Sequence, residues 1–182
     1  LCYAATQPGD PEAKTQLFAR QLPQIAERLK ATLEKLQRPQ LDNAELIAAQ
    51  TWWNSLQERH AGTDITWNTV DAETPPVLAA LFDSVAENLL HNARNKLQRE
   101  PDLKISAFLG VDRNKPCLSI SDNGTPIPVD RATSLLHETV ESEDGLGIGL
   151  YHAARQAEAN GYTLSLSENG AGKVSFRLSA QA

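Results

Sequence analysis

Apolar residues in the first part of the chain recur at steps of three and four, the spacing that places side chains on one face of an α-helix. Residues 11–37 carry a narrow apolar seam of this kind, like that of a coiled coil, made of Phe18, Leu22, Ile25, Leu29, Leu33 and Leu36. Pro23 marks either a kink or the start of the strongest part of this helix. A second helix is predicted over residues 41–59, with Asp42 or Asn43 as its N-cap.

The remainder of the chain alternates between strand-like and helix-like patterns. Short apolar or alternating runs bounded by turn residues predict strands over residues 65–70, 105–111, 117–121, 163–168 and 173–179. Helical spacing returns over residues 77–98, and another helix is predicted from a glycine run at 145–149 to about residue 160. We expect Trp52 and Trp53 to be packing residues of the core.

Between the third and fourth predicted strands, residues 125–144 show no clear strand, only a helical turn near 131–136. An irregular segment of that length indicates a functional lid or a disordered loop. The predicted strands mostly come in consecutive pairs with helices between the pairs, which favours an antiparallel sheet over a doubly wound parallel one. We therefore expect an α+β fold, organised as a two-layer α/β sandwich.

The composition narrows the class of protein. Hydrophobic residues at 41% and charged residues at 22% are ordinary for a globular chain, and a net charge of -6 disfavours a nucleic-acid-binding protein. No apolar run approaches the roughly 18 residues that a membrane-spanning helix needs, so we expect no embedded segment. Cys2 and Cys117 have no metal-ligand spacing, which disfavours a zinc site and fits a reducing compartment. Because the chain begins at Leu1 and contains no Met, we expect it to be part of a longer protein.

Three asparagines occupy one stripe of the helix predicted over residues 77–98. Asn88, Asn92 and Asn95 recur at steps of four and three, so their amides line up beside the apolar face. Because asparagine is a mediocre helix former, such a stripe weakens the helix unless it binds something. An amide oxygen is a suitable ligand for Mg²⁺, which takes substrate phosphates as further ligands. A solvated polar edge explains the stripe equally well.

A carboxylate and a glycine follow the strand predicted over residues 117–121. Asp122 at the strand end could accept the exocyclic amino group of adenine, and Gly124 would let the backbone approach the ring closely. Asn-Gly after an apolar run is also a standard hairpin turn. Pro126 and Pro128 argue against the hairpin, because they hinder a return strand.

Glycines alternate with aliphatic residues at the start of the helix predicted from residue 145. The run is Gly145, Leu146, Gly147, Ile148, Gly149 and Leu150. Backbone N–H groups at such a helix start can cradle a phosphate, although a flexible hinge has the same composition. The spacing matches neither a dinucleotide-binding fingerprint nor a Walker P-loop.

Taken in order, these motifs resemble the Bergerat-fold ATPases, the superfamily of gyrase, Hsp90, MutL and histidine kinases. Residues 39–182 are most similar to the catalytic and ATP-binding domain of a bacterial sensor histidine kinase, and residues 21–37 resemble the second helix of the dimerisation and phosphoacceptor hairpin. The resemblance implies two domains, 1–38 and 39–182, and a sheet with helices on one face. It also implies ATP and Mg²⁺ as cofactors, a response regulator as partner, and a homodimer formed through the hairpin of the full-length protein. The expected location is a cytoplasmic domain of a membrane-anchored bacterial sensor.

The resemblance also assigns roles to individual residues. It gives Asn88 a catalytic role and makes Asn92 the Mg²⁺ ligand, while Asp122 binds adenine and the hydroxyl of Ser175, beside Gly172 and Phe176, assists through water. The nucleotide-binding residues that it implies are Asn88, Asn92, Asn95, Lys96, Asp122, Gly124, Ile127, Gly145, Leu146, Gly147, Ile148, Gly149, Leu150 and Ser175.

The chain departs from the family pattern at several positions. Asn95 stands where these kinases commonly have Lys, and Pro126 replaces the second glycine of the first glycine motif. Acidic residues precede the phosphate loop, so neutralisation of the phosphates falls on Mg²⁺ and Lys96. None of the four histidines has the phosphoacceptor context, and His137-Glu138 in the lid matches it only superficially. We therefore expect the acceptor histidine to lie upstream of Leu1.

Two other functions remain open. An ATP-hydrolysing clamp of the gyrase or MutL type would need a Glu four residues before the Mg²⁺ ligand, but Asn88 occupies that place and Glu87 is one residue earlier. A degenerate nucleotide-binding or dimerisation module would accommodate both Pro126 and the acidic lid, and it would fail to bind Mg-ATP.

Overall fold

The computed structural model describes residues 45–68, 73–138 and 149–181. The chain divides into two units, Leu1–Gln40 and Leu41–Ala182, and all described residues belong to the second. The helix predicted over residues 11–37, the caps at Asp42 or Asn43, and the first four residues of the glycine run lie outside the described residues. Their roles, and the boundary between domains 1–38 and 39–182, stay predictions.

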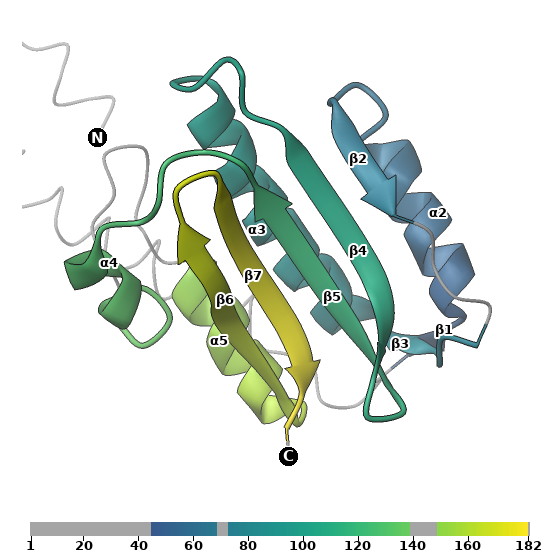
Figure 1. Ribbon diagram of the computed structural model, residues 1–182. Coiled ribbons are helices and arrows are strands. Elements are labelled where there is room, and N and C mark those ends of the chain that lie inside the picture. The colour runs from purple at the N-terminus through teal and green to yellow at the C-terminus, as the bar shows by residue number, and fades with distance from the viewer. Residues whose placement is uncertain (1–44, 69–72, 139–148, 182) are drawn as a thin grey trace, which may run out of the picture. The chain divides into compact units, whose positions relative to one another are not determined.

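One layer of the described unit is a five-stranded sheet with the order β2-β4-β5-β7-β6 (Figure 1). The strands are β2 (Ile65–Asn68), β4 (Ile105–Asp112), β5 (Lys115–Asp122), β6 (Tyr162–Gly170) and β7 (Lys173–Ala180). β2 runs parallel to β4, and the other neighbouring pairs are antiparallel. The pairing of β6 with β7 shifts register between Leu166 and Glu168, which is a β-bulge.

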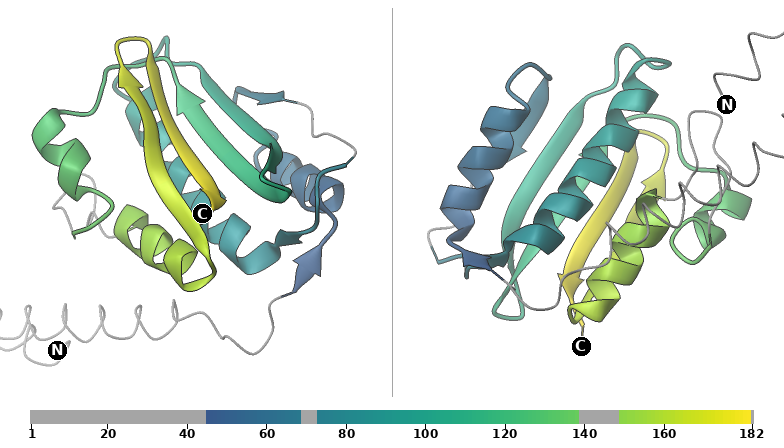
Figure 2. Two further views of the ribbon diagram at one scale, coloured as in Figure 1. Left: turned by 60° about the horizontal axis from the view of Figure 1, so that its bottom comes forward. Right: turned by 180° about the vertical axis from the view of Figure 1, so that it is seen from behind.

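Three helices form the second layer. The helices α2 (Ala49–Arg59), α3 (Ala79–Leu97) and α5 (Gly149–Ala159) lie side by side on one face of the sheet (Figure 2). A short helix, α4 (Val129–Ser134), lies beyond the β6 edge in Figure 1. The expected α+β sandwich, with a mixed and mostly antiparallel sheet, is confirmed. Among the described residues no helix is long and apolar enough to cross a bilayer.

The core lies between the sheet and the helices. The predicted apolar face of the long helix is buried there, at Leu81, Val85 and Leu89. Trp52 and Trp53 are core residues, as predicted, and they make edge contacts with Phe82 and Trp67 at ring-centroid distances of 5.5 and 5.1 Å. Aromatic pairs in this geometry contribute beyond the area that they bury.

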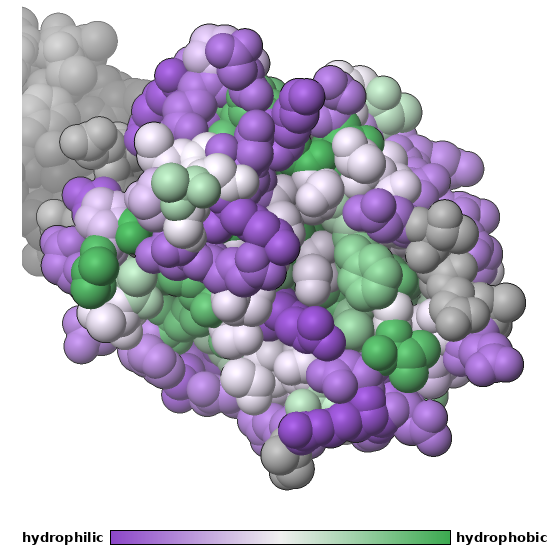
Figure 3. All heavy atoms as spheres, in the orientation of Figure 1, coloured by the Kyte–Doolittle hydropathy of each residue, from purple (hydrophilic) through white to green (hydrophobic). Residues whose placement is uncertain are grey.

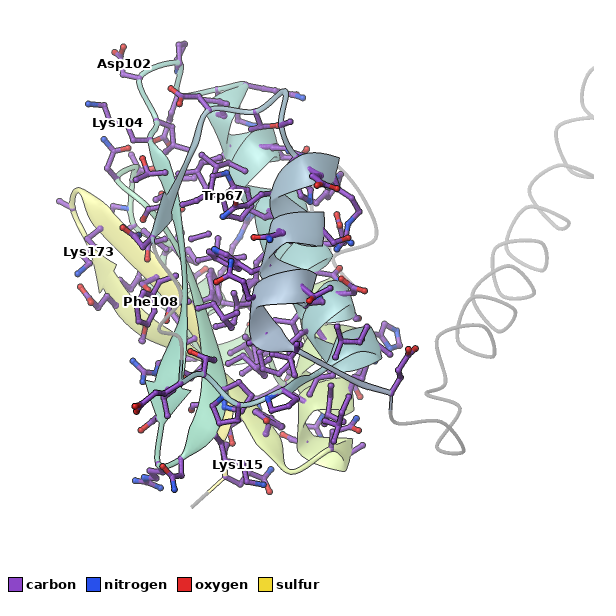
Figure 4. The ribbon with its side chains drawn as sticks, turned by 90° about the vertical axis from the view of Figure 1, so that its right-hand side faces the viewer. Trp67, Asp102, Lys104, Phe108, Lys115 and Lys173 are labelled. Carbon is purple, nitrogen blue, oxygen red and sulfur yellow. The ribbon has the colours of Figure 1, made fainter. Side chains whose placement is uncertain are left out.

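The opposite face of the sheet faces away from the helices and is mainly hydrophilic (Figure 3). Small hydroxyl residues such as Ser106, Ser119 and Ser165 alternate with the buried apolar residues of these strands. Phe108 is an exception, since 40% of it is exposed (Figure 4). An antiparallel sheet with one polar face needs no third layer, which explains why the sandwich stops at two.

Several predicted boundaries were wrong at short elements. Leu46–Ile47 is not helical but forms β1, which pairs antiparallel with β3 (Val77–Leu78), so both predicted helices begin later than expected. The Ala79 N–H donates to the carbonyl of Glu45 at 3.1 Å, which ties the two helix starts together. Strands of two residues are too short to show an apolar period.

The turn between β4 and β5 is also tighter than predicted. Arg113 and Asn114 alone form it, with φ of 51° and 62°, whereas Lys115 and Pro116 already belong to β5. Positive φ at both central residues is the geometry of a two-residue hairpin turn, which matches the twist of the two strands.

Two phenylalanines provide a test of the core. Phe82 is completely buried against Trp52 and Tyr162, so Phe82→Ala should lower the free energy of unfolding by about 3–5 kcal/mol. Phe108→Ala, the matched control on the exposed face, should cost about 1 kcal/mol or less. Urea unfolding of both variants checks this, and equal losses would contradict the assignment of the two faces.

Candidate functional site

The candidate site follows one flank of α3. Asn88, Asn92 and Lys96 succeed one another at steps of four residues along this flank. The start of α5 meets the helix near Asn88, and the segment after β5 meets it near Lys96. The two meeting points are eight residues apart, which is about 12 Å along an α-helix.

Asn88 is held in one orientation. Its Nδ2 donates to the carbonyl of Ser84 at 2.7 Å, so its Oδ1 is directed away from that carbonyl and lies against Gly149, the first residue of α5. A Cβ at Gly149 would overlap this oxygen, so only glycine lets the two helices approach here. The structure thus brings together two residues from separate predicted motifs. Leu150, the next residue of α5, packs partly buried against the core.

The rest of the asparagine stripe is more open. Asn92 is exposed, and its amide makes no hydrogen bond to any residue in the described ranges. Asn95 contacts His91 one turn away, with 3.2 Å between Nδ2 and the ring Nε2. Within the described ranges the stripe therefore combines a fixed amide at Asn88 with an unpartnered one at Asn92.

Asp122 lies at the end of β5 on the helix side of the sheet. Its side chain is 11% exposed, and its Oδ1 accepts hydrogen bonds from the Gly124 N–H at 2.9 Å and from Lys96 Nζ at 2.7 Å. The same ammonium donates to the Thr125 carbonyl at 2.6 Å. Lys96 therefore lies at the Asp122 end of the site, away from the start of α5, and this place does not suit the phosphate neutralisation expected of it.

Glu100, which the sequence interpretation missed, holds the segment after Asp122. Its carboxylate accepts hydrogen bonds from the Thr125 N–H at 3.0 Å and from the Thr125 hydroxyl at 2.5 Å. These bonds, together with the charge of Lys96, lower the pKa of Glu100. A Cβ at Gly124 would overlap Glu100 and Lys96, so this glycine too is required by close packing. The spacing of four residues between Lys96 and Glu100 is the only signal that could have pointed to Glu100.

Ile127 is fixed from the other side. The side-chain amide of Asn169, on β6, accepts a hydrogen bond from the Ile127 N–H and donates one to its carbonyl, both at 2.8 Å. The beginning of the predicted lid is thus tied at Thr125 to Glu100, just after α3, and at Ile127 to β6, and α4 follows directly. The sequence interpretation ended the predicted strand at residue 168, one residue before Asn169, and missed this contact.

The structure separates the side chain of Ser175 from that of Asp122. In the β5–β7 ladder Ser175 faces Ser121, whereas Asp122 faces Val174. Since side chains alternate along a strand, Ser175 lies on the opposite side of the sheet from Asp122. Its hydroxyl is buried and accepts a hydrogen bond from the Ser121 hydroxyl at 2.9 Å. Val174 occupies the place beside Asp122.

We compared the chain with family models, curated proteins and solved structures. No family model and no curated protein matches the chain. A nucleotide-free catalytic domain of the histidine kinase ThkA matches with a TM-score of 0.55 and 16% identity, over 75% of this chain and 94% of that chain. The Acinetobacter baumannii histidine kinase AdeS matches with a TM-score of 0.54 and 20% identity, over 99% of this chain and 89% of that chain. Full-length ShkA in complex with AMPPNP matches with a TM-score of 0.58 and 18% identity, over 77% of this chain and 32% of that chain.

The described unit has the fold of a histidine kinase catalytic domain. The resemblance that the motifs indicated is therefore confirmed at the level of the fold, which is what similarity at these identities establishes.

Glu87 lies on the other flank of α3 in this kinase fold. Its carboxylate is 3.3 Å from Arg59 Nε and 3.1 Å from His60 Nε2, both from the α2 side. His60 is buried, and its other ring nitrogen contacts Arg94. Glu87 is thus engaged with α2 and does not belong to the asparagine stripe, which argues against a role as the water-activating base of a hydrolase.

Substitution of Gly149 tests the contact with Asn88. Gly149→Ala should lower the free energy of unfolding by about 1–3 kcal/mol, because the new methyl group forces Asn88 or α5 to move. Gly62→Ala is the matched control, since nothing lies within 4 Å of a Cβ there, and it should change stability by about 0.5 kcal/mol or less. Urea unfolding measures both. A fully stable Gly149→Ala variant would show that the helices do not approach as described.

Proposed function

We propose that this chain is the ATP-binding catalytic part of a two-component sensor histidine kinase, which transfers the γ-phosphoryl group of ATP to a histidine outside the chain. The observation that carries the proposal is the placement of Asp122. This nearly buried carboxylate lies on the same side of the sheet as the asparagine flank of α3. The kinase fold and the AMPPNP complex of ShkA support nucleotide binding by this domain.

The base would bind at the Asp122 end of the flank. A nearly buried carboxylate is a good partner for the 6-amino group of adenine, and it discriminates against bases that lack this donor. The Gly124 N–H holds Oδ1 of this carboxylate, and Ile127 is fixed through Asn169. The phosphates would then extend along α3 toward Asn88 and the start of α5. A span of about 12 Å between the two ends accommodates the base, sugar and phosphates of one nucleotide.

The phosphate end offers groups that fit a magnesium-nucleotide. We assign the Mg²⁺ ligand to Asn92. Its exposed amide oxygen is a hard ligand atom, and it has no hydrogen-bond partner in the described part of the chain. Bound Mg²⁺ would neutralise charge on the phosphates. We assign a catalytic role to Asn88, whose Nδ2 has a second N–H to donate to a phosphoryl oxygen. The proposed phosphate loop consists of residues 145–149, of which only Gly149 is described.

The acceptor histidine is proposed to come from the hairpin of the longer protein. The four histidines of the chain are His60, His91, His137 and His152, so none lies in residues 1–44. His60 is buried between Glu87 and Arg94 and cannot reach a nucleotide. In the proposed full-length protein the hairpin forms the homodimer, and a response regulator receives the phosphoryl group.

One observation favours a second function, the degenerate nucleotide-binding or dimerisation module. The ammonium of Lys96 already occupies one oxygen of Asp122. If this ion pair prevents Asp122 from binding a base, no nucleotide binds. The domain would then act only as a dimerisation module. Titration with nucleotide separates the two functions.

Nucleotide binding is the first test. The chain should bind Mg-ADP and Mg-ATP in a calorimetric titration, and Asp122→Ala should weaken binding by roughly 1–3 kcal/mol, about 5- to 150-fold, because it removes a buried hydrogen-bond partner of the base. Asp64→Ala, an exposed carboxylate before β2, serves as the control and should bind like the wild type. Absence of binding to the wild type would select the degenerate module.

Phosphoryl transfer is the second test. The chain alone should not become labelled on histidine by γ-³²P-ATP, because a nucleophile must be held about 3 Å from the phosphorus and in line with the leaving oxygen. Addition of a hairpin polypeptide that carries an acceptor histidine should give acid-labile, base-stable label on the hairpin. Asn88→Ala should reduce this labelling at least about 100-fold if Asn88 is catalytic. Labelling of the chain itself that disappears in His137→Ala would refute the proposed acceptor.

A further inference from the structure

The two carboxylate oxygens of Asp122 are not equivalent. Oδ1 accepts hydrogen bonds from the Gly124 N–H at 2.9 Å and from Lys96 Nζ at 2.7 Å. A carboxylate oxygen has two lone-pair sites, so Oδ1 is filled. No hydrogen bond from a residue in the described ranges reaches Oδ2. Asp122 therefore presents one free acceptor instead of two.

Neighbouring contacts hold the carboxylate in this state. Lys96 cannot swing away freely, because its ammonium also donates to the Thr125 carbonyl at 2.6 Å. Thr125 is in turn bound twice by Glu100. Gly124 packs directly against the stem of Lys96, and only 20% of the lysine side chain is exposed. Charge-assisted hydrogen bonds of this kind are stronger than neutral ones.

We infer that Lys96 is a specificity-determining residue, which sets the preference of this site for adenine over guanine by filling one oxygen of Asp122. The inference rests on the proposed function, because it assumes that Asp122 binds the base. The 6-amino group of adenine needs a single acceptor, and Oδ2 supplies it. The N1–H and 2-amino group of guanine form a pair of parallel donors, which is matched only by a carboxylate with both oxygens free.

This function differs from the phosphate-binding role that the sequence implied for Lys96. A lysine at the phosphate end would raise affinity for every nucleotide through its charge, whatever the base. A lysine that fills Oδ1 alters the ranking of the bases instead. The ratio of affinities for different bases therefore separates the two roles, and a purely structural role would leave that ratio unchanged.

The inference is tested by calorimetric titration with Mg-ADP, Mg-GDP and Mg-IDP. Inosine shares the 6-oxo group and N1–H of guanine but lacks the 2-amino group. In the wild type, ADP should bind tightest, and GDP should bind no more than about twofold better than IDP, because the 2-amino group finds no second acceptor. In Lys96→Met, which keeps the unbranched stem, GDP should bind clearly better than IDP. The GDP-to-ADP ratio of dissociation constants should fall about tenfold.

Two further variants serve as references. Lys96→Arg, which retains a charged donor, should restore the preference for ADP. Lys115→Met removes a lysine at the opposite end of β5, far from the end marked by Asp102 and Lys104 in Figure 4, and should leave every ratio unchanged. Circular dichroism confirms that each variant is folded. If Lys96→Met is unfolded, the inference is judged from the wild type alone, by whether GDP binds no more than about twofold better than IDP.

The outcomes are distinguishable. Wild-type binding of ADP with an unchanged GDP-to-ADP ratio in Lys96→Met overturns the inference but leaves the proposed function intact. A wild type that already binds GDP much better than IDP also overturns it, because the 2-amino group would then find a second acceptor despite Lys96. A Lys96→Met variant that loses GDP affinity overturns it as well, since Lys96 would then contact the base itself. Absence of any nucleotide binding to the wild type overturns both.

Discussion

The rotation of α3 about its own axis is the constraint on which the rest of the site depends. Burial of Leu81, Phe82, Val85 and Leu89 between the sheet and the neighbouring helices fixes that rotation. With 3.6 residues per turn, the two flanks of the helix are then determined. One flank turns Asp83 and Glu87 toward α2, where they pair with Arg59, and the other presents the asparagines and Lys96. A single apolar face thus separates structural carboxylates from the proposed binding surface.

The sequence predicted the larger elements because long apolar periods report burial directly. Such periods are present in the long helix and in the strands β4 to β7. The helix that begins at Gly149 is marked by the glycine run before it. The sequence could not predict β1 and β3, since two-residue strands have no period. The side of the sheet on which Ser175 lies could not be predicted for a related reason, because a shift of one residue in a strand exchanges the two sides of the sheet.

Polar contacts between distant segments were harder to foresee. Lys96 with Asp122, Glu100 with Thr125 and Asn169 with Ile127 join positions 25 to 42 residues apart. Charged and amide side chains of this kind have many partners of suitable chemistry along a chain. Only the packed backbone selects among them. The motifs therefore indicated the region of the candidate site, while the structure shows which of its side chains pair.

The bulge in β6 has a consequence for how copies of this domain can associate. Strands at the edge of a sheet expose unpaired backbone groups that invite a second chain to add to the sheet. Here one edge strand, β2, has four residues in the described part of the chain. The other, β6, is interrupted between Leu166 and Glu168, next to the Glu168–Lys173 ion pair. Short, bulged and charged edges are poor templates for sheet extension. The self-association proposed for the full-length protein is therefore better served by helical surfaces than by its strands.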